Sequence, residues 1–387
     1  MKEDNMKQGW EYTTFADVMK PAKTERCGNR TDLPVLSITM RQGIIFQSNR
    51  FKKAIASTDT KDYKIIKEGQ LVIAFPIDEG LIYTQDIVKE GIMSPAYNVW
   101  DVDYSKLNNK FLNLFFHSPW AMKYYKSKLR GTTLRRRMIP KEDLLALPIP
   151  VPPLSVQEQI VSELDLLSGI IEKKREQLKE LDALAQSIFY DMFGDPEQSS
   201  YNIIPLSKLS NNKLSYGSGA SAIPFNGEIR YIRITDIKED GKLNTEAVSP
   251  SIMEEKYILN EGDILFARSG ATVGKTYLYK ESDGKAIYAG YLIRFIPNKE
   301  QVLPTYIYYY TKTDYYKAFI SKSAQAVAQP NINAQQYGLF MVPVPPIPLQ
   351  HQFATKIEAI ERQKELIKQS ISETETLFNA RMQEHFG

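Results

Sequence analysis

One proline-rich stretch occurs twice in this chain and leads each time into a pattern typical of a helix. Its first copy reads Pro150-Val151-Pro152-Pro153-Leu154-Ser155-Val156-Gln157-Glu158-Gln159-Ile160, and its second copy begins 193 residues later with Pro343-Val344-Pro345-Pro346. The same offset carries Gln157 onto Gln350 and Phe193-Gly194 onto Phe386-Gly387. Because twice this offset nearly equals the 387 residues of the chain, the sequence is one unit written twice.

The proline runs mark boundaries, because proline is excluded from helix interiors and biases the residue before it toward extended geometry. Ser155 and Glu158 match the S-x-x-E capping box, which predicts a helix capped by Ser155. Pro348, near the corresponding place in the second copy, suits a first helical turn. The predicted segments are residues 1–153, 154–194, 195–346 and 347–387, in which globular parts alternate with long helices.

Apolar residues alternate at spacings of four and three along both helical segments, which is the heptad pattern of a coiled coil. The first seam contains Ile160, Leu164, Leu167, Ile171, Leu178, Leu181 and Ile188, and the second contains Phe353, Ile357, Ile360, Ile367, Ile371 and Phe378. Polar residues interrupt the seams at Lys174, Lys364, Thr374 and Arg381. Such helices often serve only as a dimerisation or tail coiled coil, but two seams in one chain are expected to pair with each other.

An antiparallel pair would relate the two copies by a pseudo-two-fold axis and hold two similar globular parts at a fixed distance. At about 1.5 Å per residue, the stretch from Ile160 to Ile188 spans roughly 42 Å. The predicted fold is therefore α+β, with two homologous β-rich domains separated by two long helices packed as an antiparallel coiled coil.

Both globular segments contain short apolar runs bounded by turn residues, which indicates strands. These runs are residues 33–38, 71–75, 230–234, 263–267 and 291–295, and Asn226-Gly227 and Asp240-Gly241 are turn signals. An aromatic, helical stretch comes late in each segment, at residues 111–129 and 306–322. Most of its rings are expected in the core, although exposed rings could form a ligand platform.

Two loops after these aromatic stretches carry the candidate DNA contacts. Residues 130–137 are rich in arginine, whose planar fork suits phosphate oxygens and the guanine edge. At the equivalent place, residues 325–333 are rich in glutamine and asparagine, whose amides suit adenine. A solvated surface loop and ordinary turn chemistry are the alternatives. The contrast between an arginine-rich and an amide-rich loop would suit two globular domains that read different DNA sequences.

Residues 269–276 resemble a phosphate-binding loop, but Ser269 stands where G-x-x-x-x-G-K-[ST] requires glycine. The segment that follows resembles a strand and not the helix that would hold a phosphate. We therefore predict a hairpin loop that faces DNA through Arg268 and Lys275. His351 and His385 fall on the second long helix and resemble surface residues, so no base for a nucleophile is evident.

Composition excludes several classes of protein. The chain is 43% hydrophobic and 25% charged, which is typical of a folded protein. Its net charge of +3 is too small for a general polyanion binder, although residues 1–153 are basic and residues 154–194 acidic. One cysteine and three histidines exclude a disulfide scaffold and make a metal site improbable. Apolar runs are too short for a membrane helix, and the start lacks a signal-peptide core, so we expect a cytoplasmic protein.

The duplicated P-x-P-P-L-x-x-Q-x-x-I segment, the long helices ending in Phe-Gly, and the stretch Glu261-Gly262-Asp263-Ile264-Leu265-Phe266-Ala267-Arg268-Ser269-Gly270 together resemble the specificity subunit of type I restriction-modification systems. The resemblance covers essentially the whole chain. The second copy departs from it at Pro348, His351 and Phe353. It implies a non-catalytic subunit whose two modules are target recognition domains, each reading half of a split double-stranded DNA site.

The resemblance also implies the partners. Two methyltransferase subunits would dock on the helices and hold S-adenosylmethionine, and two restriction subunits would use ATP and Mg²⁺. No cofactor, catalytic residue or metal is expected in this chain. The expected DNA contacts are Lys123, Lys126, Arg130, Arg135, Arg136 and Arg137 in the first module, and Arg268, Lys275, Gln325, Gln329, Asn331 and Asn333 in the second.

The residues also fit a different class of protein. Two β-rich modules on a coiled-coil spacer could form a protein-interaction scaffold, which would show no DNA sequence preference. A nucleotide hydrolase using residues 269–276 is the third interpretation.

Overall fold

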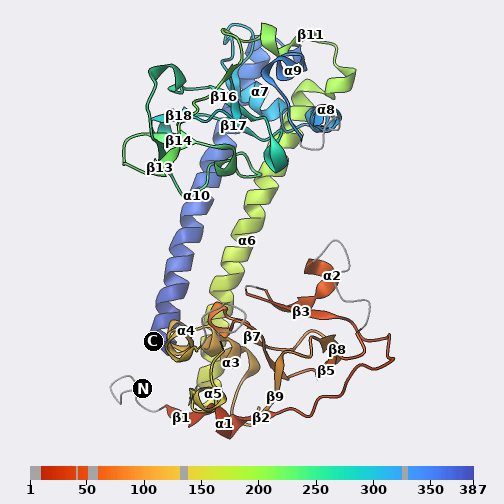
Figure 1. The fold of residues 1–387 in the computed structure, drawn as a ribbon, viewed down its shortest axis with the longest axis vertical. Helices are drawn as coiled ribbons and strands as arrows, with labels where there is room; N and C mark the ends of the chain where they lie inside the picture. The colour runs from red at the N-terminus through yellow and green to blue at the C-terminus, as the bar shows by residue number, and fades with distance from the viewer. Residues whose placement is uncertain (1–9, 41, 51–59, 131–137, 325–329) are drawn as a thin grey trace. The chain divides into compact units, whose positions relative to one another are not determined.

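The computed structural model describes residues 10–40, 42–50, 60–130, 138–324 and 330–387 (Figure 1). The chain forms two compact units, the first from residues 1–174 and 369–387 and the second from residues 175–368. Two long helices, α6 (Leu154–Phe193) and α10 (Ile347–Phe386), contribute residues to both units. We call the residues before α6 the first module and the residues between α6 and α10 the second module.

The helices α6 and α10 pack antiparallel within each unit. In the first unit, Glu163 of α6 contacts Arg381 of α10, and Lys174 of α6 contacts Ser370 of α10. Residue numbers therefore increase along α6 while those of their partners decrease along α10, which is the order of an antiparallel pair. In the second unit, the same order relates Asp182 to Lys364 and Phe189 to Phe353. The predicted antiparallel pairing is therefore confirmed in each unit.

The heptad seam provides the apolar contact between these helices. All thirteen predicted seam residues are buried or half-buried; Leu164 and Phe353 are completely buried. Complete burial of a side chain such as Leu164 or Phe353 contributes roughly 1.5–3 kcal/mol relative to leaving it in water, and half-buried positions contribute less. The interruptions in the seam are paired. The ammonium group of Lys174 donates to the hydroxyl group of Ser370 at 2.5 Å, and Arg381 forms an ion pair with Glu163.

The predicted capping box is wrong. The helix α6 begins at Leu154, and the N–H groups of Val156 and Gln157 donate to the carbonyl oxygen of Pro153. Ser155 thus lies inside the first turn, two residues after the N-cap position, which Pro153 occupies. Pro346 plays the same part for α10, where Pro348 lies in the first turn as predicted.

Gln157 and Gln350 explain why the two helix starts are so similar. Both side chains are completely buried. The oxygen of Gln157 accepts from the N–H of Asn108, while its amide group donates to the carbonyls of Lys106 and Pro152. Gln350 makes the matching three bonds, with Leu303, Gln301 and Pro345. Each glutamine therefore ties a proline segment to the loop that precedes an aromatic helix of its module.

The first module is built around an antiparallel sheet with the strand order β2-β9-β6-β7. Its strands are β1 (Glu11–Thr14), β2 (Met19–Pro21), β3 (Leu36–Thr39), β4 (Gly43–Phe46), β5 (Lys64–Lys67), β6 (Leu71–Ile73), β7 (Ile82–Thr84), β8 (Glu90–Met93), β9 (Asn98–Val102) and β10 (Pro148–Val151). Its helices are α1 (Phe15–Val18), α2 (Gln47–Arg50), α3 (Asn109–Phe116), α4 (Pro119–Lys128) and α5 (Lys141–Leu145). Antiparallel pairs β1·β10, β3·β4 and β5·β8 complete its described part.

The second module repeats this sheet with the order β12-β19-β16-β17. Its strands are β11 (Asn202–Pro205), β12 (Ser215–Tyr216), β13 (Ala222–Pro224), β14 (Arg230–Ile232), β15 (Val248–Pro250), β16 (Ile264–Ala267), β17 (Thr276–Leu278), β18 (Ala286–Tyr288), β19 (Leu292–Phe295) and β20 (Met341–Val344). Its helices are α7 (Pro304–Tyr310), α8 (Asp314–Ala324) and α9 (Ala334–Gly338). Strands β14 and β18 pair in parallel, while β11·β20 and β13·β15 are antiparallel.

The aromatic stretches are helical and belong to the core, as predicted. Tyr306, Tyr310 and Tyr316 are almost completely buried in the second module. Each long helix also ends in a core. Phe386 packs on Phe111 with ring centres 5.3 Å apart in the first unit, and Phe193 packs on Tyr306 at 4.9 Å in the second.

His385 corrects the prediction that both histidines lie on the helix surface. Its side chain is 13% exposed, and its Nε2 atom lies 3.1 Å from the carboxylate of Glu163, because α10 turns this position toward α6. His351 is exposed, as predicted. Among the described residues, no helix is both long enough and apolar enough to cross a membrane.

Candidate nucleic-acid interface

The helix α4 of the first module presents lysines to solvent. Ser118 caps this helix by accepting from the N–H of Ala121, and Pro119 occupies its first turn. Lys123 and Lys126 are exposed, so their ammonium groups are available to a ligand.

Arg130 follows α4 at the start of the arginine-rich loop. Its guanidinium group is 73% exposed and lies 3.7 Å from the carboxylate of Asp143, which also binds Lys128 at 2.9 Å. The backbone of Arg130 pairs with that of Met138, which closes the base of the loop. The predicted contacts Arg135, Arg136 and Arg137 lie outside the described residues.

The loop after β16 in the second module is a hairpin loop, as predicted. Strands β16 and β17 pair antiparallel, so the loop between them returns directly to the same sheet. It contains only a single short 3-10 turn at residues 270–272 before the strand β17 begins at Thr276. A phosphate-binding loop requires a helix at this place, so the nucleotide-hydrolase interpretation loses its structural basis.

Lys275 in this hairpin is engaged within the module. Its ammonium group binds Glu239 at 2.8 Å and the carbonyl of Ile237 at 3.3 Å, and its side chain is 19% exposed. Contact with DNA would therefore require Lys275 to leave Glu239.

Arg268 lies at the other end of the hairpin, beside two residues from distant segments. Its guanidinium carbon is 4.7 Å from the centre of the Tyr216 ring, and its Nε donates to the side-chain oxygen of Asn331 at 3.3 Å. Residues 269 and 331 form a backbone bridge, which brings the amide-rich segment to this place. The structure thus unites two predicted contacts, Arg268 and Asn331, at one site.

Asn333 has a structural task in addition to any role in binding. Its side-chain oxygen accepts from the N–H of Gln336 and caps α9, while its own N–H donates to the Gln336 side chain. The oxygen that would contact a base is therefore already engaged. Gln325 and Gln329 lie outside the described residues.

Sequence reasoning missed the aromatic residues of this site. Tyr216 is 40% exposed and accepts a hydrogen bond from the N–H of Ala334, and Tyr291 is 62% exposed. The available signal was a tyrosine followed by Gly217-Ser218-Gly219, since small residues leave a neighbouring ring uncovered.

The first module has a cavity where the second module has Arg268. Phe75, which the offset of 193 places on Arg268, lines a cavity of about 390 Å³ together with Trp100 and Met138. Lys64 and Lys141 also line it, and the ammonium group of Lys64 donates to the carbonyl of Tyr97 at 2.6 Å. The two modules therefore share a sheet topology but differ in chemistry at this corresponding place.

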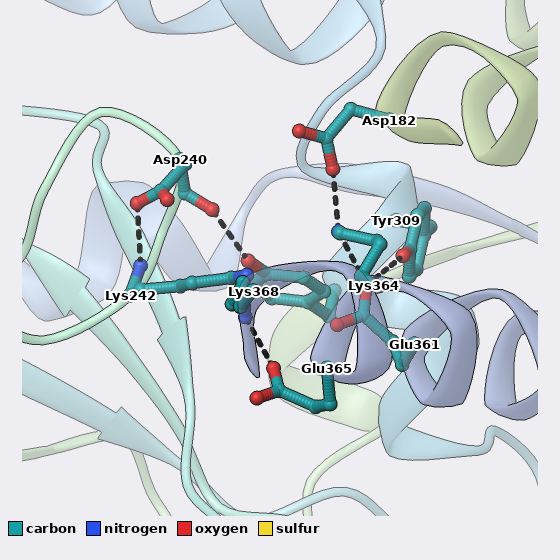
Figure 2. A network of polar contacts seen from close by, with 9 residues as sticks. Asp182, Asp240, Lys242, Tyr309, Glu361, Lys364, Glu365 and Lys368 are labelled. Atoms are coloured by element: carbon teal, nitrogen blue, oxygen red, sulfur yellow. Dashed lines mark hydrogen bonds and ion pairs between the residues drawn. The ribbon is translucent and has the colours of Figure 1, made fainter. Parts of the chain in front are cut away.

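A network of charged residues joins the second module to its stretch of the helix pair (Figure 2). The ammonium group of Lys364 donates to Asp182 at 2.5 Å and to Glu361 at 2.6 Å, and Tyr309 donates to Glu361 at 3.4 Å. Burial acts to lower the pKa of Lys364, but its two carboxylate partners hold that pKa above the ordinary value. The charge at this seam position is therefore retained in the folded protein.

Beside this network, the turn of residues 239–242 approaches α7 and α10 along a groove of about 1280 Å³. Burial, followed by the neighbouring ammonium groups of Lys368 and Lys364, lowers the pKa of Lys242 to about 8. Burial also lowers the pKa of Lys312 to about 8; its ammonium group lies 4.5 Å from the centre of the Tyr308 ring. Gly241 has a φ of +75° and no room for a side chain against Tyr308. The predicted turn at Asp240-Gly241 is confirmed.

The described residues contain no group of three or more His, Cys, Asp or Glu side chains arranged to hold a metal ion. Cys27 is buried, and its thiol donates to the carbonyl of Arg30 at 3.1 Å. The candidate site thus consists of basic, amide and aromatic side chains.

Comparison with known proteins identifies the family. A model of the type I restriction modification DNA specificity domain matches residues 8–182 and 206–376. The chain therefore belongs to the type I restriction-modification DNA specificity family. It is a specificity subunit of such a system, with DNA target recognition domains, and each matched region also includes part of a long helix.

Relatives agree with this assignment over nearly the whole chain. The MjaVIII type I restriction enzyme specificity subunit of Methanocaldococcus jannaschii is 24% identical over 398 residues, covering 93% of this chain and 90% of that protein. The S subunit of a type I restriction-modification system from M. genitalium is 15% identical, with a TM-score of 0.56, and covers 100% of this chain and 98% of its own. A chain from a structure of type I R-M complex assembly is 16% identical, with a TM-score of 0.60, covering 99% and 98%. The two solved structures show that the fold is shared.

Proposed function

We propose that this chain selects a bipartite double-stranded DNA target, with one half-site read by each module, and that it catalyses no reaction itself. The observation that carries this proposal is a repeated sheet with different chemistry at one corresponding place. There the first module presents a cavity beside Phe75, and the second presents Arg268 on Tyr216. Two modules of one topology with different surfaces suit the recognition of two different short sequences.

The proposed contacts in the first module are Lys123, Lys126 and Arg130, together with Arg135, Arg136 and Arg137 of the loop. Lysine and arginine contacts to phosphate position a protein on the duplex, while contacts to base edges specify the sequence. The exposed ammonium groups on α4 suit the first task. In the second module, the proposed contacts are Arg268, Lys275, Gln325, Gln329, Asn331 and Asn333.

Partner subunits would supply the chemistry. Two methyltransferase subunits that dock on the helices would bring S-adenosylmethionine and modify adenine, and two restriction subunits would bring ATP and Mg²⁺. The family assignment supports these partners, and the cytoplasm is the compartment in which they would meet DNA.

Methylation mapping tests the proposal directly. DNA from cells that express this chain with its methyltransferase would be sequenced for adenine methylation and compared with DNA from cells that lack this chain. We expect a split motif that appears only with the chain. If a complex with the methyltransferase forms but no motif appears, sequence selection by this chain is contradicted; if no complex forms either, a protein-interaction scaffold becomes the better explanation.

A further inference from the structure

The backbone of Arg268 is fixed from both sides. Its N–H group donates to the carbonyl of Tyr291 at 3.1 Å, and its carbonyl accepts from the N–H of Ile332 at 2.8 Å. These bonds connect the end of β16 to the start of β19 and to the segment before α9. The point from which the side chain extends is therefore determined by three segments of the module.

The side chain of Arg268 is also held, but its charge is not neutralised. The guanidinium group stacks on the Tyr216 ring at 4.7 Å, and Nε donates to Asn331 at 3.3 Å. Among the described residues, no carboxylate pairs with it. Arginine has five N–H donors, and Asn331 occupies only the one on Nε. The terminal fork, which is the part that makes bidentate contacts, remains available.

The other three arginines of the second module engage their terminal nitrogens inside the module. Arg230 has no carboxylate partner in the described residues, but its Nη2 donates to the backbone and side-chain oxygens of Asn244 at 2.7 and 3.1 Å. Arg233 binds Asp236 at 2.8 Å, and Arg294 binds Asp263 at 2.5 Å with only 8% of its side chain exposed. Those two guanidinium groups have carboxylate partners inside the module and serve its structure. Arg268 is half-buried and is oriented by a ring and an amide, and no carboxylate in the described part of the module pairs with it. This arrangement is typical of a side chain prepared for an external acceptor.

We propose that Arg268 reads a guanine in the half-site of the second module, with Tyr216 and Asn331 as positioning residues. The inference rests on the proposed recognition of a bipartite DNA target. Guanine presents two acceptors, O6 and N7, in the major groove, and their spacing matches the arginine fork. Arginine also binds phosphate in a bidentate manner. The base is chosen because phosphate oxygens can be approached from several directions, whereas O6 and N7 lie in the plane of one base and require a fork of fixed orientation, such as Tyr216 and Asn331 provide.

The first module provides an internal contrast. The position that corresponds to Arg268 is Phe75, which has no hydrogen-bond donor in its side chain. A guanine read by Arg268 would therefore belong to one half-site only, and changes at Arg268 should leave the other half-site intact.

The test compares the methylated motifs produced by the full chain and its Arg268→Ala and Arg268→Lys variants, each expressed with the methyltransferase. Arg268→Lys keeps the charge but loses the fork. We expect both variants to lose the preference for one guanine in one half-site, by roughly 5- to 150-fold, which corresponds to about 1–3 kcal/mol. The matched control is Lys285→Ala, which removes an exposed positive charge of the same module and should leave the motif unchanged.

The outcomes separate the two levels of inference. No motif with the unchanged chain contradicts the proposed function and this inference together. A motif that stays identical in both Arg268 variants overturns the guanine contact alone. Uniform weakening at all positions, with the base preferences unchanged, would identify a phosphate contact and also overturn it.

Tyr216 provides a second measurement that does not depend on the Arg268 variants. Tyr216→Leu removes the aromatic face, whereas Tyr216→Phe keeps it and loses only the hydroxyl that accepts from Ala334. We expect Tyr216→Leu to relax the same guanine position and Tyr216→Phe to preserve it. A purely structural role would lower the melting temperature without changing the preferred base, and that result would remove Tyr216 from the recognition site.

Discussion

The ammonium group of Lys364 lies 2.5 Å from the carboxylate of Asp182, across the seam between α10 and α6 in the second unit (Figure 2). Lys364 is 4% exposed, whereas the side chain of Asp182 is 57% exposed. A buried charge of this kind stabilises little by itself, but it is costly to leave without its partners. The loss of stability should therefore differ between removing the lysine and removing its carboxylate partners.

Removing the two carboxylates should lower the free energy of unfolding more than removing the lysine does. We expect the double variant Asp182→Asn, Glu361→Gln to lower the free energy of unfolding by about 3 kcal/mol, because Lys364 would keep a buried charge without a counter-ion. Lys364→Met should change the free energy of unfolding by less than about 1.5 kcal/mol, since both carboxylates can reach water and methionine nearly keeps the side-chain volume of lysine. Urea unfolding measures both values, and equal losses in the two variants would contradict the prediction.

The two buried glutamines should contribute similarly to stability. Gln157→Ala and Gln350→Ala each leave one N–H and two carbonyl groups without their partner. At about 1–3 kcal/mol for a buried polar group left unsatisfied, we expect each change to cost at least about 2 kcal/mol. Gln159→Ala and Gln352→Ala are matched controls, because both of these glutamines are exposed. Thermal unfolding at one pH compares the four variants, and similar melting temperatures for all of them would show that the buried bonds contribute nothing.

Lys312 should make stability depend on pH in the alkaline range. Burial lowers its pKa to about 8 in the folded protein, while the unfolded value stays near 10.4. Below pH 8, both states carry the proton and the full penalty of the buried charge is present. As the pH rises above 8, the folded state loses its proton first, so the free energy of unfolding increases, by up to about 3 kcal/mol at pH 10.5.

The measurement is the difference in melting temperature between the original chain and Lys312→Met at pH 7 and at pH 9.5. We expect the advantage of Lys312→Met at pH 7 to shrink toward pH 9.5, because the lysine penalty disappears as the folded state deprotonates. Taking the difference cancels the contribution of the tyrosines, whose ionisation in the unfolded state begins near pH 10. A difference that is constant with pH would show that Lys312 keeps its ordinary pKa.

The arginine-rich loop of the first module should contribute to the salt dependence of DNA binding. Replacing Arg135, Arg136 and Arg137 together with alanine should weaken binding and reduce the slope of log K against log salt by up to about three, because each phosphate contact contributes about 0.9. The control variant replaces three exposed lysines, Lys67, Lys89 and Lys106, with alanine and so removes the same amount of positive charge. The measurement is a DNA-binding titration at several salt concentrations. If the slope of the triple arginine variant matches that of the original chain, the loop does not belong to the interface.

Periodicity predicted the helix pair, since the spacing of apolar residues reports directly which face is buried. The repeat predicted that Gln157 and Gln350 correspond, but their three bonds depend on loops far away in the sequence. Tyr216 was missed for the same reason, because only the folded sheet brings it to Arg268. The cap at Ser155 was predicted two residues too late, because the helix begins at Leu154 and the carbonyl oxygen of Pro153 accepts from the N–H groups of Val156 and Gln157.

The packing of Phe386 has a genetic consequence. The last residues of α10, including Met382 and Phe386, complete the core of the first unit, so that unit is assembled from both ends of the chain. A nonsense mutation just before Met382 would therefore damage the first module, which is encoded far upstream of the mutation. Exchange of modules between related genes would preserve both cores only if the recombined long helices still match each other at their ends.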